Sequence, residues 1–181
     1  MIQLFKKGFA IKHSNLPHIS LKGYYQFVTF RTYDSIDSFI LKLSAIILPD
    51  KIKQYKIDRY LDFSHNGRYL NDNILLYLRD YLLSCDGKLF ELIAFSIMPN
   101  HIHLLFRETI PLTKVMQTFK GTTAFEINKM LKKSGKFWAN GYFDRLIRDQ
   151  KHFEITYNYI KNNAPKAGLK DCKDRFYGIY N

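Results

Sequence analysis

Two apolar segments separated by only Pro99 and Asn100 constrain the fold of this chain most strongly. Residues 90–98 (FELIAFSIM) and 101–107 (HIHLLFR) are rich in β-branched and aromatic side chains, which is typical of strands. A Pro-Asn pair between two such runs is a turn signal. We therefore expect an antiparallel strand pair joined by a tight turn, in the middle of the fold.

Periodicity in the rest of the chain surrounds this pair with further elements. We expect a strand over 24–32, helices over 35–47, 71–84 and 112–133, an extended segment over 137–147, and a last helix over 151–163 capped by Asp149. Residues 51–69 show no clear period, so we expect a loop or irregular insertion there and assign it no role. The order contains a β-α-β-β-α-β core, which predicts an α/β (α+β) ferredoxin-like sandwich with an antiparallel sheet and an additional C-terminal helix.

The charge balance indicates what the chain binds. Lysine and arginine number 28 against 16 acidic residues, which gives a net charge of +12. A domain this basic usually meets a polyanion, and nucleic acid is the leading candidate, although a solvated basic surface without a partner is the alternative. An anionic membrane surface fits less well, because the positive charges are spread along the chain.

Several classes of protein are excluded on composition and spacing. No window approaches 18 uninterrupted apolar residues, and no secretory signal is visible, so we expect neither a membrane span nor membrane binding. Cys85 and Cys172 are not part of a Cys-x-x-Cys motif, which argues against a disulfide scaffold and a structural zinc site. These features fit the reducing cytoplasm.

The sharpest chemical feature is His101-Ile102-His103. Residues i and i+2 of a strand point to the same face, so both imidazoles project together and could bind one divalent ion. A partly buried histidine pair with no ligand is the alternative interpretation. Tyr159 and Asn163 lie one helical turn apart, so Asn163 could offer its carbonyl oxygen as a third ligand beside the phenol. Alternatively, Tyr159 flanks an apolar stripe and Asn163 caps the helix.

These motifs together resemble a known family. Residues 98–105 (MPNHIHLL) resemble the His-hydrophobic-His signature of HUH endonucleases, in the form found in single-tyrosine, IS200-like transposases. Further blocks are similar to REP-associated tyrosine transposases: 16–18 (LPH), 27–31 (FVTFR), 119–124 (FKGTTA), 137–138 (FW), 144–149 (DRLIRD) and 159–163 (YIKNN). The likeness covers residues 16–169 in order, so we expect one HUH transposase-like domain over 1–181, with this core and short basic extensions.

The resemblance implies a chemistry for the matched residues. His101, His103 and Asn163 match the ligands of Mg²⁺ or Mn²⁺, and Tyr159, on a catalytic C-terminal helix, matches the nucleophile. It implies a 5′-phosphotyrosine intermediate with a free 3′-OH, formed during DNA transposition and recombination on single-stranded DNA or REP-like hairpins in the bacterial cytoplasm. Both monomers and homodimers whose last helix completes the neighbour's site occur in the broader resemblance. One departure is the proline after Asn163, which stands one place later than the family pattern has it.

Basic and aromatic residues near these motifs are candidates for DNA contacts. Candidates for holding the backbone are Lys120, Lys132, Lys133, Lys136, Arg145, Arg148 and Lys161, and candidates for stacking on bases are Trp138, Tyr142 and Phe143. Each is alternatively a solvated charge or a core ring. Two other functions remain open at this point: a domesticated, non-catalytic nucleic-acid-binding protein, and a metal-dependent phosphoesterase that uses water.

Overall fold

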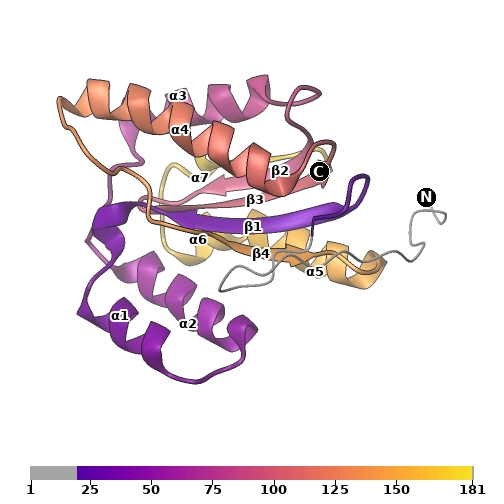
Figure 1. Ribbon diagram of the computed structural model, residues 1–181, viewed down its shortest axis with the longest axis horizontal. Helices are drawn as coiled ribbons and strands as arrows, with labels where there is room; N and C mark the ends of the chain where they lie inside the picture. Colours follow the sequence, from indigo (N-terminus) through magenta and orange to yellow (C-terminus); the bar gives the residue numbers. More distant parts are fainter. Residues whose placement is uncertain (1–19, 181) are drawn as a thin grey trace.

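A five-stranded antiparallel sheet organises the fold in the computed structural model, which describes residues 20–180 (Figure 1). The strands are β1 (Tyr25–Arg31), β2 (Phe90–Ile97), β3 (His101–Glu108), β4 (Phe143–Leu146) and β5 (Phe176–Gly178). Their spatial order is β4-β1-β3-β2-β5. The first four strands follow the predicted β-α-β-β-α-β pattern, so the expected ferredoxin-like core is confirmed.

Helices cover both faces of this sheet (Figure 1). The helical elements are η1 (Tyr33–Ser35), α1 (Ser38–Ala45), α2 (Asp50–Phe63), α3 (Asp72–Ser84), α4 (Leu112–Leu131), α5 (Gln150–Lys161), α6 (Asn163–Lys166) and α7 (Cys172–Arg175). Helices α3 and α4 lie over one face, and α5 lies over the other face together with the α1–α2 pair. The candidate site lies on this second face.

Strand β1 distributes its side chains between two cores. Val28 and Phe30 join the larger cluster, which also contains residues of α3 and α4, whereas Phe27 joins a smaller cluster with α5 residues such as Ile160. Alternation across a strand sends neighbouring side chains to opposite faces. The same alternation therefore leaves Thr29 and Arg31 on the α5 face, beside the histidines of β3.

The segment 51–69 is not the loop that the sequence indicated. Most of it belongs to α2, which runs from Asp50 to Phe63. The buried side of this helix carries Ile57 and Leu61 but also the polar residues Gln54 and Asp58. Two polar residues at buried positions interrupt the apolar period, and a search for an apolar stripe therefore misses the helix.

The C-terminal region also differs from the expectation. Helix α5 ends at Lys161 with Asn162 as its C-cap, and Asn163 begins the next short helix, α6. Residues 172–178, which the sequence suggested to be a basic extension, form α7 and the edge strand β5, which pairs with β2. Buried Arg175 joins these elements to the fold by donating hydrogen bonds to Leu70 O and Ile97 O.

The structure describes residues 20–180, and this range decides how the predictions for the N-terminal segment and for a membrane span can be compared with it. The block 16–18 and the whole of the basic N-terminal extension before it lie outside the described residues. Within residues 20–180, no helix is long and apolar enough to cross a membrane.

Candidate active site

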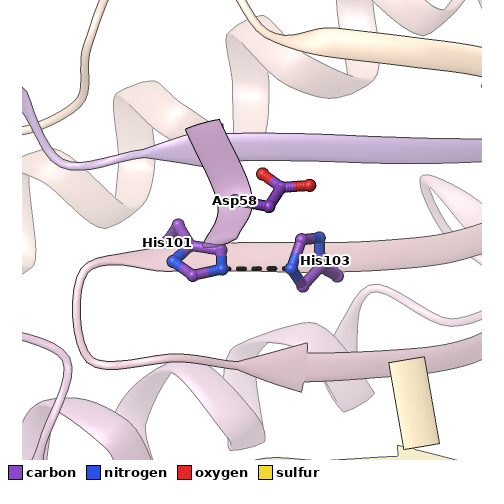
Figure 2. Close-up of side chains that lie close together, drawn as sticks. All are labelled: Asp58, His101 and His103. Atoms are coloured by element: carbon purple, nitrogen blue, oxygen red, sulfur yellow. Dashed lines mark hydrogen bonds between the residues drawn. The ribbon is translucent and has the colours of Figure 1, made fainter. Parts of the chain in front are cut away.

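Strand β3 presents His101 and His103 on the same face of the sheet, as their spacing predicts. Both side chains are fully buried, and their Nε2 atoms are 3.0 Å apart (Figure 2). Antiparallel pairing places Arg31 opposite His101 and Thr29 opposite His103. The two imidazoles therefore share one small space on the α5 face of the sheet.

Hydrogen bonds at the Nδ1 atoms orient the two rings, on the side away from the facing Nε2 atoms. The amide of Asn100 donates from Nδ2 to Leu61 O and Asn66 O, so its Oδ1 is an acceptor for the Nδ1–H of His101, at 2.8 Å. The Nε2 of a neutral His101 then carries a lone pair that faces His103. The Nδ1 of His103 is 2.8 Å from the hydroxyl of Thr29, which can accept from it in the same way.

Burial keeps both imidazoles neutral. It lowers the pKa of His103 to about 3, and burial together with neighbouring His103 and Arg31 holds the pKa of His101 well below its ordinary value. A neutral imidazole is the form that binds a metal ion. The pair is therefore in the ligand form throughout the physiological pH range.

Helix α2 adds carboxylates that the sequence analysis did not assign. Asp58, His101 and His103 each offer a ligand atom, and these atoms lie within 4.8 Å of one another (Figure 2). Asp62 lies one helical turn further on, with Oδ1 3.8 Å from His101 Nε2. Burial raises the pKa of Asp58 to about 7 and that of Asp62 to about 6, because desolvation disfavours a carboxylate.

Tyr159, on α5, lies against this cluster. Its hydroxyl donates to Asp58 Oδ2 at 3.2 Å, and its ring centroid is 5.1 Å from that of His103. Burial, followed by the charges of Asp58 and Asp62, raises the pKa of the phenol, whereas the side chain of Asn163 lowers it and so lies beside the same hydroxyl. The fold thus brings together all four residues that the sequence analysis singled out.

Three buried polar atoms around the cluster have no hydrogen-bond partner among residues 20–180. They are Arg31 Nε, Asp62 Oδ1 and Asn163 Nδ2. Buried polar groups are normally paired, so unpaired ones gathered around one cluster indicate a place for a ligand or water. Arg31 also brings a positive charge that acts on both His101 and Asp58.

A groove of about 680 Å³ opens beside Tyr159 and Asp58. Four cationic side chains line it: Lys51, Arg145, Arg148 and Lys151. Two of these, Arg145 and Arg148, are among the residues that the sequence analysis offered as DNA contacts. Both arginines therefore lie in the same groove as Tyr159. Their contact with DNA stays a prediction.

Of the other residues offered as DNA contacts, Phe143 also lines this groove, whereas Lys120, Lys136 and Lys161 do not. Lys120 and Lys136 line a second hollow, where Lys120 donates to Ala139 O and Gly141 O. Lys161 is exposed on α5. Trp138 is 5% exposed, packs on Phe30 and Phe137, and donates from Nε1 to Thr123 Oγ1, which is the core position that the sequence left open as the alternative. Its stacking on bases stays a prediction.

Sequence reasoning missed Asp58, Asp62 and Arg31 for different reasons. The two aspartates stand four residues apart, a spacing that places both on one face of a helix, but the helix itself was not recognised. Arg31 lies within a block that resembles the family, and its register opposite His101 could be assigned only once the pairing of β1 with β3 was known.

The chain resembles transposases in both sequence and fold. The family model described as "Transposase IS200 like" matches residues 65–163, more than half of the chain. The chain therefore belongs to the IS200-like transposase family. The matched region contains both histidines, Tyr159 and Asn163, and this membership supports a transposase-like, DNA-cleaving activity.

Two relatives illustrate the resemblance. A Haemophilus influenzae protein named as a candidate REP-associated tyrosine transposase is 28% identical over 145 residues, which cover 66% of this chain and 82% of the relative. The solved structure of a REP-associated tyrosine transposase bound to a REP hairpin has a TM-score of 0.52 and 15% identity, and it covers 90% of this chain and 79% of that chain. The structural likeness confirms the transposase fold.

Proposed function

We propose that this protein is a metal-dependent endonuclease and strand transferase that cuts single-stranded DNA through a covalent bond to Tyr159. The observation that carries the proposal is the shared cluster on the α5 face. The half-buried phenol of Tyr159 on α5 contacts a carboxylate from α2 and an imidazole from β3. A nucleophile, a proton acceptor and a pair of metal ligands thus stand together in one chain.

The cluster fits a divalent ion. Adjacent ligands about 2.1 Å from an octahedral Mg²⁺ lie about 3.0 Å apart, and the two histidine Nε2 atoms are separated by 3.0 Å. We propose that His101 and His103 hold the ion, with Asp58 and Asn163 supplying oxygen ligands. We include Asp58 among the ligands, in addition to those that the resemblance implies, because its carboxylate and the two imidazoles offer ligand atoms within 4.8 Å of one another. When bound, Mg²⁺ or Mn²⁺ would polarise a non-bridging oxygen of the scissile phosphate.

Residues of the chain supply the nucleophile, the proton acceptor and the positive charge for this step. The Tyr159 oxygen attacks phosphorus, its proton passes to Asp58 Oδ2, the Tyr–O–P bond forms, and the bond from phosphorus to the 3′ oxygen breaks. The 3′ oxygen takes up the proton that Asp58 has received, and it leaves as a free 3′-OH. A second 3′-OH can reverse the step, because the phosphotyrosine retains the ester, so the same site can join strands. Arg31 stabilises the negative charge that develops on the phosphate.

Two arguments support single-stranded or hairpin-flanking DNA as the substrate: the access of a phosphate to Tyr159, and the DNA bound by a structural relative. The tyrosine is half-buried, so a phosphate has to enter the groove beside it, and a single strand or hairpin flank can do so more readily than a continuous duplex. The structural relative bound to a REP hairpin supports a hairpin-flanking substrate. Arg145 and Arg148 are proposed to hold its backbone.

A denaturing gel tests the proposed function. Protein is incubated with labelled single-stranded and hairpin oligonucleotides and Mg²⁺ or Mn²⁺, and we expect a covalent protein–DNA band. Tyr159→Phe should abolish this band, whereas Tyr157→Phe, which removes a phenol from the same helix, should retain it.

The same gel distinguishes the other functions. Cleavage without an adduct, together with full activity of Tyr159→Phe, would show a phosphoesterase that uses water. Binding without cleavage in Mn²⁺, across all hairpins, would show a domesticated nucleic-acid-binding protein. Equal adduct in wild type and Tyr159→Phe would refute the assignment of the nucleophile.

A further inference from the structure

The groove beside Tyr159 has two walls that come from distant parts of the sequence. Lys51 and Tyr55 of α2 line one wall, and Arg145, Arg148 and Lys151 line the other, which comes from β4 and the start of α5. Asp58 and Tyr159 also line it, so the groove leads to the proposed reaction centre. The α2 wall belongs to the segment for which the sequence suggested no role.

Positive charge from both walls meets at one point in the groove. Burial lowers the pKa of His152, and so do the positive charges of Arg145, Arg148 and Lys51, which therefore all lie near the same ring. Asp149 acts on this ring in the opposite direction, and its carboxylate also caps α5 by accepting from His152 N. Three cations around one carboxylate leave an excess of positive charge, which suits a backbone phosphate.

Tyr55 gives the α2 wall an aromatic surface. Its side chain is 54% exposed, and it stands one helical turn after Lys51 on the same side of α2. An exposed ring beside cations is the combination by which proteins hold single strands, because cations track phosphates while rings stack on bases. Stacking of this kind needs an unpaired base.

We propose that this groove binds the single DNA strand that adjoins the scissile phosphate, with Lys51, Arg145 and Arg148 on its phosphates and Tyr55 stacked on a base. The inference rests on the proposed function, because it takes Tyr159 as the point where the strand is cut. It adds a strand-binding wall built from α2. In this wall, Lys51 supplies the positive charge and Tyr55 supplies the aromatic ring, and both come from α2.

Binding measurements on variants of α2 test the inference. Fluorescence anisotropy is measured with a labelled single-stranded oligonucleotide, the same sequence as a duplex, and single-stranded RNA, all in the Tyr159→Phe background so that no adduct forms. The variants are Lys51→Ala, Tyr55→Ala and Tyr55→Phe. Lys56→Ala is the matched control, because Lys56 is an exposed lysine of the same helix that does not line the groove.

We expect Tyr55→Ala to weaken single-strand binding about tenfold, with Tyr55→Phe close to wild type. Lys51→Ala should weaken it about threefold to tenfold and reduce the salt slope by about 0.7. Lys56→Ala should change neither. The preference for the single-stranded DNA over its duplex should shrink in Tyr55→Ala.

Several results would overturn the inference. These are equal losses in Lys51→Ala and Lys56→Ala, an unchanged affinity in Tyr55→Ala, duplex binding as tight as single-strand binding, or a tighter fit for RNA. The outcome is separable from that of the proposed function. If wild type forms the adduct but Lys51→Ala and Tyr55→Ala bind the single strand normally, only the groove inference is rejected. If these variants lose affinity but wild type forms no adduct, only the proposed function is rejected.

Discussion

Asp58 is the most important site residue that the sequence did not predict. It is a fully buried carboxylate that accepts hydrogen bonds from Gln54 and Tyr159 and faces the two histidines. Its raised pKa shows that burial costs more than these two hydrogen bonds return. A buried acid in such surroundings is a common mark of a functional site, because a bound cation would stabilise its ionised form.

Asp58→Asn should change how stability depends on pH. The pKa of Asp58 is raised from 3.8 in the unfolded chain to about 7, so its neutral form stabilises the fold below pH 4 and this contribution is lost as pH rises through 7. Without metal, the stability of Asp58→Asn relative to wild type should therefore increase by about 3 kcal/mol between pH 5 and pH 8. Urea unfolding in EDTA at both pH values measures this, and a constant difference would contradict it.

Metal binding should appear as thermal stabilisation. An ion present at about 100 times its dissociation constant adds about 2.7 kcal/mol, and Mn²⁺ should therefore raise the Tm of wild type by about 5–10 °C. His101→Ala and His103→Ala should lose this shift and also lose cleavage while retaining much of the DNA binding. His65→Ala, which changes an exposed histidine, is the control. A full Mn²⁺ shift in His101→Ala would show that the ion binds elsewhere.

At the scale of elements, the sequence predicted those whose apolar period is clean. The strand pair around Pro99, the helices α3 and α4, and the cap of α5 at Asp149 agree with expectation. Helix α2 was missed because Gln54 and Asp58 interrupt its buried stripe. Of the site, the histidines, Tyr159 and Asn163 could be found from their spacing and the family resemblance, whereas Asp58 and Arg31 depend on contacts between distant segments.

Strand β5 and α7 were missed for a related reason, because a buried arginine anchors them. Arg175 is 2% exposed and pairs with Leu70 O, Ile97 O, Asn71 Oδ1 and Asp171. A charged residue in a basic C-terminal stretch is ordinarily read as solvated. Apart from Asp171, its partners belong to segments that lie far from it in the sequence, so no local pattern identifies its buried position.

Arg175→Met should therefore destabilise the fold by about 3–5 kcal/mol, since it leaves buried carbonyl oxygens and a carboxylate without their donor. Chemical denaturation measures the loss. Lys173→Met removes an exposed cation of the same helix and should cost little. Equal stability of the two variants would show that Arg175 does not anchor the C-terminal elements.

At the scale of the whole molecule, the site draws its residues from positions 29 to 163 of one chain. Tyr159 contacts the histidine and aspartate of its own chain. The net charge of +12 supports attraction to a polyanion at long range, and the groove concentrates cations beside the tyrosine. The residues assigned to the candidate site therefore all come from one chain.

A mixing experiment tests this arrangement. If each chain uses its own tyrosine, a mixture of Tyr159→Phe and His101→Ala should form no more adduct than either variant alone. If the last helix completes the neighbour's site, a mixed dimer restores one intact site and the adduct returns. Adduct formation in the mixture would therefore contradict the single-chain site.

Mass spectrometry of the adduct tests most directly whether Tyr159 forms the covalent bond to DNA. Wild-type protein is incubated with a hairpin-flanked oligonucleotide and Mn²⁺, digested with protease and nuclease, and analysed by fragmentation. We predict a nucleotide attached through a 5′ phosphate to Tyr159. Attachment to another residue, or full cleavage with no attached nucleotide, would contradict the account.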